Sequence, residues 1–68
     1  MKNTIKVERA RHDMSQSDLA ERIGASRQAI YLMEKGKFVP STLLALKIST
    51  VFNVPVNELF TLEDEDWS

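Results

Sequence analysis

The sequence predicts an all-α domain made of five short helices. Apolar residues recur at the three- and four-residue spacing of one helix face, and serines stand where three of the helices would begin. The breaks between helical segments fall at Gly24, Gly36, Pro40 and Pro55. No β-hairpin turn, internal repeat or low-complexity segment interrupts this pattern, so we expect one small helical core.

Each predicted helix has a start or stop signal of its own. The second begins at Ser15, because the stretch SQSD places a hydroxyl at the N-cap and Asp18 three residues later, an approximate capping box. Gly24 suits the left-handed backbone conformation at which this helix ends, and Ser26 caps the next helix. The expected helices cover residues 3 or 4 to 12, 15 to 24, 26 to 36 and 42 to 53, followed by a short helix whose first residue is Pro55.

The apolar positions predict which helix faces form the core. The expected core residues of the second and third helices are Leu19, Ala20, Ile23, Ile30 and Met33. In the fourth helix, one arc contains Leu44, Ala45, Ile48, Val51 and Phe52. Leu43 and Leu46 lie outside this arc, and they form either a partner surface or a semi-buried edge. At the chain ends, residues 61–62 are able to pair as a short strand with residues 1–3.

Composition excludes several classes of protein. The 68 residues contain no cysteine, so neither a disulfide framework nor a thiolate metal site is expected. No apolar run approaches the roughly 18 residues of a membrane span, and the N-terminal residues lack the pattern of a secretory signal. We therefore expect a soluble, cytoplasmic protein. The sequence has no glycine-rich phosphate loop, nucleophile–base pair or spaced calcium ligands, so no enzymatic activity, cofactor or metal is expected.

Charge is distributed unevenly along the chain. The net charge is −1, yet all nine lysines and arginines lie in residues 1–57 together with only five acids, and the last eleven residues hold five acids and no base. A local basic patch, rather than the net charge, attracts a polyanion. The basic residues 1–57 therefore suit a polyanionic partner. Alternatively, these charges only form a solvated surface and the acidic tail only adds solubility. We expect the tail to be frayed.

The most informative stretch is QSDLAERIGASRQAIYLM, in which three residues separate two helices. Ala20 provides the small side chain that two steeply crossing helices need where they touch. Gly24 can adopt a positive φ at the bend at little cost. Ile30 and Met33 are in phase to anchor the second of these helices to the core. This spacing is typical of a helix-turn-helix, whose second helix enters the major groove of DNA.

Over residues 2 to about 62 the chain resembles the Xre family of Cro/C1-type DNA-binding domains. The stretches that carry the resemblance are MSQSDLAERIGASRQAIYLMEKGKFVPS, LALKI and FNVPVNELF. The resemblance implies a five-helix, lambda-repressor-like domain over residues 1–62 with an acidic tail at 63–68. It also implies a bacterial or phage transcriptional repressor that binds a palindromic operator as a homodimer. Glu8, Thr42 and Leu43 depart from the family pattern, which usually has leucine at the first two positions and a polar residue at the third.

If the third helix reads DNA, its outward residues are the candidates for base contacts. Arg27 and Gln28 lie at its N-terminal end, which reaches the base edges first. Arginine suits guanine O6 and N7, glutamine suits adenine N6 and N7, and each good pair is worth about 1–3 kcal/mol of discrimination. Tyr31 is a candidate for a contact with the DNA backbone. For Leu32, contact with a thymine methyl and packing at the helix edge both stay open.

Other residues are candidates for phosphate contacts, which fix the register on DNA without reading its sequence. The resemblance assigns this role to Gln16 at the start of the second helix, where free N–H groups also favour anions. Ser26 is a candidate for both helix cap and phosphate donor. Lys35 and Lys37 flank the loop after the third helix and are further candidates.

The resemblance also implies two structural roles. The family commonly pairs an arginine of the first helix with a glutamate near the end of the third, which here would join Arg9 to Glu34 and orient the reading helix. Dimerisation is expected through the fifth helix, because a small domain gains from burying surplus apolar residues against a symmetric copy. The residues expected there are Val56, Leu59 and Phe60.

Two functional hypotheses remain from different classes. The first is a sequence-specific DNA-binding regulator whose partner is double-stranded DNA. The alternative is a protein-interaction module, such as an antitoxin-like or antirepressor protein, built on the same fold. Gln16, Arg27 and Gln28 favour the first hypothesis, whereas an acidic face at the same positions would have favoured the second.

Overall fold

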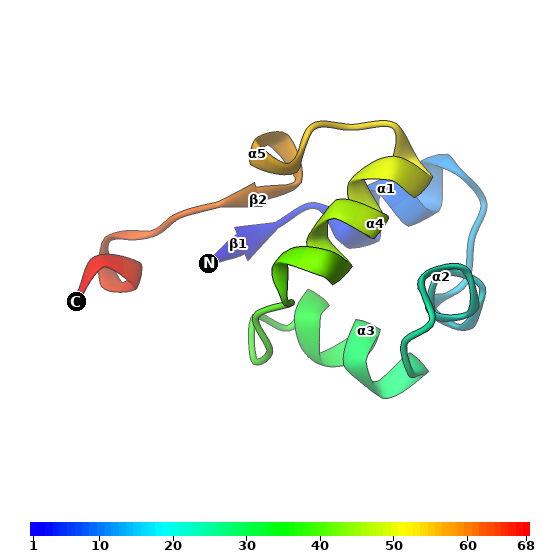
Figure 1. The fold of residues 1–68 in the computed structure, drawn as a ribbon, viewed down its shortest axis with the longest axis horizontal. Coiled ribbons are helices and arrows are strands. Elements are labelled where there is room, and N and C mark those ends of the chain that lie inside the picture. The colour runs from blue at the N-terminus through cyan, green and yellow to red at the C-terminus, as the bar shows by residue number, and fades with distance from the viewer.

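Five α-helices joined by short loops form the body of the molecule, and the two chain ends pair as a small antiparallel sheet beside it (Figure 1). This computed structural model describes all residues, 1–68. The helices are α1 Ile5–Arg11, α2 Gln16–Ile23, α3 Arg27–Glu34, α4 Thr42–Phe52 and α5 Val56–Leu59. The predicted all-α class and the order of the helices are confirmed. None of the helices has the length and hydrophobicity required to cross a membrane.

Both ends of α2 carry the signals predicted from the sequence. Ser15 Oγ accepts a hydrogen bond from the backbone N–H of Asp18 at 3.0 Å, and the Asp18 carboxylate accepts one from the Ser15 N–H at 2.9 Å, which completes the capping box. These hydrogen bonds favour the ionised carboxylate and hold the pKa of Asp18 below its ordinary value. At the other end, Gly24 has a φ of 72°, and Lys47 Nζ donates to the carbonyl of Ile23 at 3.2 Å.

Several helix boundaries differ from the prediction by one or two residues. Helix α1 begins at Ile5, because Asn3 belongs to a strand and its side-chain oxygen accepts a hydrogen bond from the Ile5 N–H at 3.2 Å. Helix α3 ends at Glu34, and the positive φ of 73° follows only at Gly36. Pro55 has an extended ψ of 144°, so it precedes α5 as its N-cap instead of forming its first residue.

One apolar core joins all five helices and the second strand. Its buried members are Ile5, Leu19, Ala20, Ile23, Ile30, Met33, Ile48, Phe52, Leu59 and Phe60. The core residues predicted for α2 and α3 are all among them, so that prediction is confirmed. In α4, two residues of the predicted arc are buried and the other three are partly buried. Leu43 and Leu46 lie outside the core and are 62% and 54% exposed.

The predicted pairing of the two chain ends is present, but the second strand begins one residue earlier than expected. Strand β1, Lys2–Asn3, runs antiparallel to strand β2, Phe60–Thr61. Phe60 therefore belongs to a strand, and its side chain turns into the core. Leu62, which was expected to pair, lies beyond the strand and is 57% exposed.

The acidic tail is ordered, so the prediction of a frayed end is wrong. Asp64–Trp67 form a single turn of 3-10 helix. The Met1 ammonium lies 3.0 Å from Glu63 Oε1 and 3.2 Å from Asp66 Oδ2, and these carboxylates raise the pKa of that ammonium. Trp67 is 77% exposed. Neither the tail nor any other part of the chain brings together three or more His, Cys, Asp or Glu side chains able to hold a metal ion.

We predict that Gly24→Ala lowers the free energy of unfolding by about 1–2 kcal/mol, because a Cβ is disfavoured in the left-handed region that this residue occupies. Space does not limit the substitution, since the nearest atom to the added Cβ would be Lys47 Nζ at 3.9 Å. Urea unfolding followed by circular dichroism measures the loss. Gly24→Asn is the matched control and should lose less, because asparagine tolerates this conformation. Equal stability of the alanine variant and the wild type would contradict this account of the bend.

Candidate nucleic-acid interface

Helices α2 and α3 cross steeply through a turn of only three residues. Figure 1 shows α2 nearly end-on while α3 runs across the view, with residues 24–26 between them. Ala20 is 4% exposed and lies in the core, as expected for a small residue at the helix crossing. Ser26 Oγ accepts a hydrogen bond from the Ala29 N–H at 3.0 Å, so α3 begins directly after the bend. The helix-turn-helix predicted from the spacing is therefore present.

Helix α3 has one buried side and one exposed side. Ile30 and Met33 are 0% and 1% exposed, and they fix the inner side to the core. No other element covers the outer side of α3 in Figure 1. Leu32 is partly buried, so it lies between the two sides. The exposed residues of this helix and its two caps are Ser26, Arg27, Gln28, Tyr31 and Lys35.

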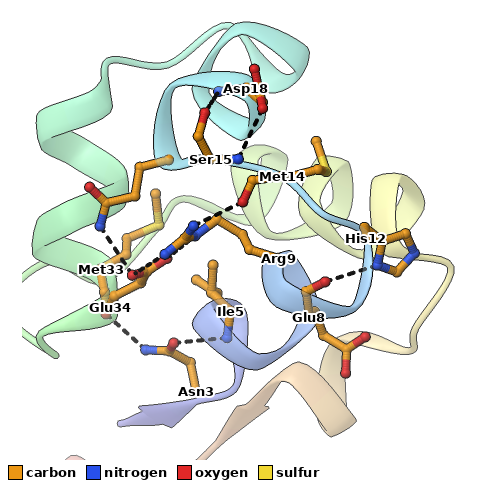
Figure 2. Close-up of polar contacts among 11 residues, drawn as sticks. Asn3, Ile5, Glu8, Arg9, His12, Met14, Ser15, Asp18, Met33 and Glu34 are labelled. Atoms are coloured by element: carbon orange, nitrogen blue, oxygen red, sulfur yellow. Dashed lines mark hydrogen bonds and ion pairs between the residues drawn. The ribbon is translucent and has the colours of Figure 1, made fainter.

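Arg9 of α1 binds the C-terminal end of α3. Its Nε donates to Glu34 Oε2 at 2.6 Å and its Nη2 donates to Glu34 Oε1 at 3.1 Å (Figure 2). The two side chains are 14% and 8% exposed, so the pair is largely shielded from water. Arg9 Nη1 also donates to the carbonyl of Met14 at 2.9 Å, just before α2. The arginine and glutamate that the resemblance pairs are thus in bidentate contact, and the same guanidinium holds the chain that leads into α2.

Gln16, the first residue of α2, belongs to the same network. Its Nε2 donates to Glu34 Oε1 at 3.1 Å, which ties the start of α2 to the end of α3. The side chain is partly buried, and its second amide N–H and its carbonyl oxygen form no other hydrogen bond within the chain. Its predicted contact with phosphate stays a prediction, and these remaining groups are the ones able to make it.

The predicted phosphate contacts do not all lie together. Gln16, Tyr31 and Lys35 line one polar recess, whereas Ser26 and Lys37 lie outside it. The Lys35 ammonium is 5.7 Å from the centre of the Tyr31 ring. Ser26 uses its hydroxyl oxygen as a helix cap, which leaves the hydroxyl hydrogen available to a phosphate oxygen. All of these roles stay predictions.

Two positioning residues were missed by the sequence analysis. Asn3 Nδ2 donates to the carbonyl of Met33 at 2.8 Å, so β1 holds the last turn of α3 (Figure 2). Lys47 of α4 binds the last turn of α2. An asparagine just before a helix is a common cap signal, and it could have singled out Asn3. Nothing local could have indicated its contact with a carbonyl 30 residues away.

Two of the three residues predicted at the dimer surface are buried in their own chain, and the dimer surface itself stays a prediction. Leu59 is 0% exposed and Phe60 is 9% exposed, because both pack into the core of their own chain. Only Val56 among the three predicted residues remains partly accessible. The exposed large apolar side chains that line a hollow together with Val56 are Val39 and Leu46.

We predict that Arg9→Met lowers the free energy of unfolding by about 3–5 kcal/mol, because the Glu34 carboxylate would be left shielded from water without its partner. Adding Glu34→Leu to this variant should restore much of the loss, since no uncompensated charge then remains. The control is Arg22→Met, which removes an exposed arginine that forms no ion pair and should cost less than about 0.5 kcal/mol. Chemical denaturation measures all three values. Similar losses for the two arginine variants would show that the Arg9 pair does not orient α3.

Several proteins are similar to this chain along nearly its whole length. An uncharacterized HTH-type transcriptional regulator from Methanocaldococcus jannaschii is 47% identical over 66 residues, which cover 97% of this chain and 100% of the relative. The uncharacterized HTH-type transcriptional regulator YgzD of Bacillus subtilis has the same identity and coverage. A third protein of this description, from Archaeoglobus fulgidus, is 42% identical over 66 residues, with 97% of this chain and 94% of the relative covered.

The matching family model agrees with the geometry of the site. The model for the helix-turn-helix domain matches residues 5–59, from the first residue of α1 to the last of α5. The matched segment thus contains the α2–α3 elbow, the ion pair that orients it and all but one of the buried core residues. The chain therefore belongs to the helix-turn-helix family of the Cro/C1, or Xre, type.

Proposed function

We propose that this protein is a sequence-specific regulator of transcription that binds double-stranded DNA with α3 in the major groove. The observation that carries the proposal is the exposed polar side of α3, which no other element covers (Figure 1). Helix α3 is anchored from behind by buried apolar residues and at its end by Glu34. Family membership and the names of the relatives, which are HTH-type transcriptional regulators, support DNA as the partner.

The exposed side chains divide into two kinds of contact. Arg27 and Gln28 stand at the N-terminal end of α3 and are proposed to read base edges through bidentate hydrogen bonds. Leu32 lies at the edge of this surface, where it is proposed to contact a thymine methyl. The proposed phosphate contacts, which fix register on any sequence, are Gln16, Ser26, Tyr31, Lys35 and Lys37.

We further propose a homodimeric repressor that acts on chromosomal DNA in the cytoplasm and occupies a palindromic operator. A two-fold dimer places its two reading helices about 34 Å apart, one turn of B-DNA, so each α3 meets one half of the operator. In the proposed mode of action, the bound dimer occupies a promoter and excludes the polymerase.

A second copy of this chain is the proposed occupant of the apolar hollow between the start of α4 and α5. The hollow has a volume of about 240 Å³ and is lined by Met1, Val39, Pro40, Thr42, Ala45, Leu46, Val56 and Phe60. It includes Val56, the accessible member of the predicted dimer residues, and the exposed Leu43 lies on the same helix as Leu46. A two-fold contact here would bury apolar side chains that each core leaves in water.

We predict that Arg27→Ala weakens binding to the selected operator by about 1–3 kcal/mol and relaxes preference at one base position per half-site. Gln16→Ala should weaken binding by about 0.5–1.5 kcal/mol on every sequence, because a phosphate contact carries no base information. In-vitro selection of bound DNA followed by titration measures both effects. Unchanged affinity and unchanged sequence preference in the Arg27 variant would refute the proposed role of α3.

We predict that Leu46→Glu converts a dimer in solution into a monomer, because it places a charge in an apolar contact. Sedimentation equilibrium measures the mass, and cooperative binding to a two-half-site operator should be lost in the same variant. The control is Val7→Glu, which alters a similarly exposed apolar side chain, 52% against 54%, that does not line the hollow. A wild-type protein that stays monomeric on and off DNA would refute the proposed homodimer.

A further inference from the structure

A polar recess opens where α1, the start of α2 and the end of α3 meet. It has a volume of about 250 Å³ and is lined by Lys6, Arg9, Gln16, Tyr31, Glu34 and Lys35. Only one of the six lining residues is hydrophobic, so the recess suits a polar ligand. Lys6 contributes to it from α1, and neither the spacing of the elbow nor the resemblance assigned Lys6 a DNA contact.

The recess carries two positive charges that no acid of the chain neutralises. The Glu34 carboxylate accepts hydrogen bonds from Arg9 at 2.6 and 3.1 Å and from Gln16 at 3.1 Å, so its charge is matched inside the network. Neither Lys6 nor Lys35 takes part in an ion pair. Two exposed ammonium groups therefore flank a pocket whose single carboxylate is already paired, and this arrangement attracts an anion.

The lining also offers hydrogen-bond donors suited to a tetrahedral oxyanion. Tyr31 provides a phenolic O–H, and Gln16 retains one amide N–H. Lysine ammonium groups bind phosphate as compact charges without a fixed planar geometry, so two of them can approach one phosphate group from different helices.

The position of the recess along α3 relates it to the DNA backbone. Arg27, Tyr31 and Lys35 stand four residues apart and form one row on the exposed side of α3. With a rise of 1.5 Å per residue, the recess end of this row lies about 12 Å from Arg27. The major groove is about 12 Å wide, so a helix whose N-terminal residues reach the bases places its other end at the groove wall, which is formed by phosphates.

We propose that this recess binds a single phosphate of the DNA backbone in each half-site, and that Lys6 is a phosphate ligand supplied by α1. The inference rests on the proposed DNA-binding function and adds a third helix to the contact. Lys6 and Lys35 act on the same phosphate from opposite sides of the recess, while the Arg9–Glu34 pair forms its wall.

The test measures DNA affinity as a function of salt for the wild type, Lys6→Gln, Lys35→Gln and Arg11→Gln. Lys6→Gln should weaken binding about threefold to tenfold on every sequence and reduce the slope of log affinity against log salt by about 0.9 for each half-site bound, the value for one phosphate contact. Lys6→Arg should restore both. Arg11→Gln removes one charge from the same helix outside the recess and should leave the slope unchanged.

A neutral methylphosphonate placed at successive backbone positions identifies the phosphate. At one position per half-site, the methylphosphonate should weaken DNA binding by the wild type. It should add little to the loss of affinity already caused by Lys6→Gln or by Lys35→Gln. The inference is wrong if the wild type binds DNA but the two lysines are coupled to different phosphates. It is also wrong if Lys6→Gln behaves like the Arg11→Gln control. Failure of the wild type to bind any duplex would instead refute the proposed function.

The same titrations distinguish a DNA phosphate from a free one. With chloride replaced by inorganic phosphate at equal ionic strength, the difference between the wild type and Lys6→Gln should persist, because the DNA phosphate is held in place by the rest of the interface. If inorganic phosphate abolishes that difference by occupying the recess, the recess is a site for the free anion and the inference is wrong.

Discussion

The Arg9–Glu34 ion pair is the contact on which the presentation of α3 depends. One guanidinium binds the end of α3 through Glu34 and the chain ahead of α2 through the Met14 carbonyl, and Gln16 completes the link between the two helices. A shielded pair of this kind adds little net stability, but any arrangement that separates its partners leaves a charge without compensation. Its main effect is therefore on orientation: it penalises every position of α3 except the one observed.

Orientation has to be imposed on α3, because an eight-residue helix is marginal by itself in water. Ile30 and Met33 supply the apolar anchor on one side, and the capped bend from Gly24 to Ser26 fixes the entry. In a chain of 68 residues the core is small, so the helix proposed to bind DNA also contributes buried side chains to that core. Stability and recognition are consequently coupled, and substitutions on the inner side of α3 will weaken DNA binding without touching DNA.

Most of the fold followed from local signals in the sequence. Capping serines, the Gly24 bend and the phase of Ile30 and Met33 are short-range features, and each predicted a feature that the structure contains. The errors arose from contacts between distant segments. Phe60 was expected in the fifth helix, but it belongs to β2 because it pairs with β1. Leu59 packs into the core of its own chain, and periodicity alone could not distinguish such a residue from one that faces a second chain. Likewise, the recess that adds Lys6 to the candidate site exists only because three helices converge.

The same geometry explains how a chain of net charge −1 can present a surface suited to a polyanion. Helix α3 contains one acid, Glu34, and Arg9 neutralises it within the fold. Two acids of the tail, Glu63 and Asp66, bind the Met1 ammonium, and Figure 1 shows the tail extending away from the helical body. At physiological salt, charges separated by more than about 8 Å are largely screened from one another. Glu63 lines one pocket with Lys35 at the C-terminal end of α3, but the Met1 ammonium matches its charge. The exposed side of α3 therefore keeps the positive charges of Arg27 and of Lys35 at its C-cap.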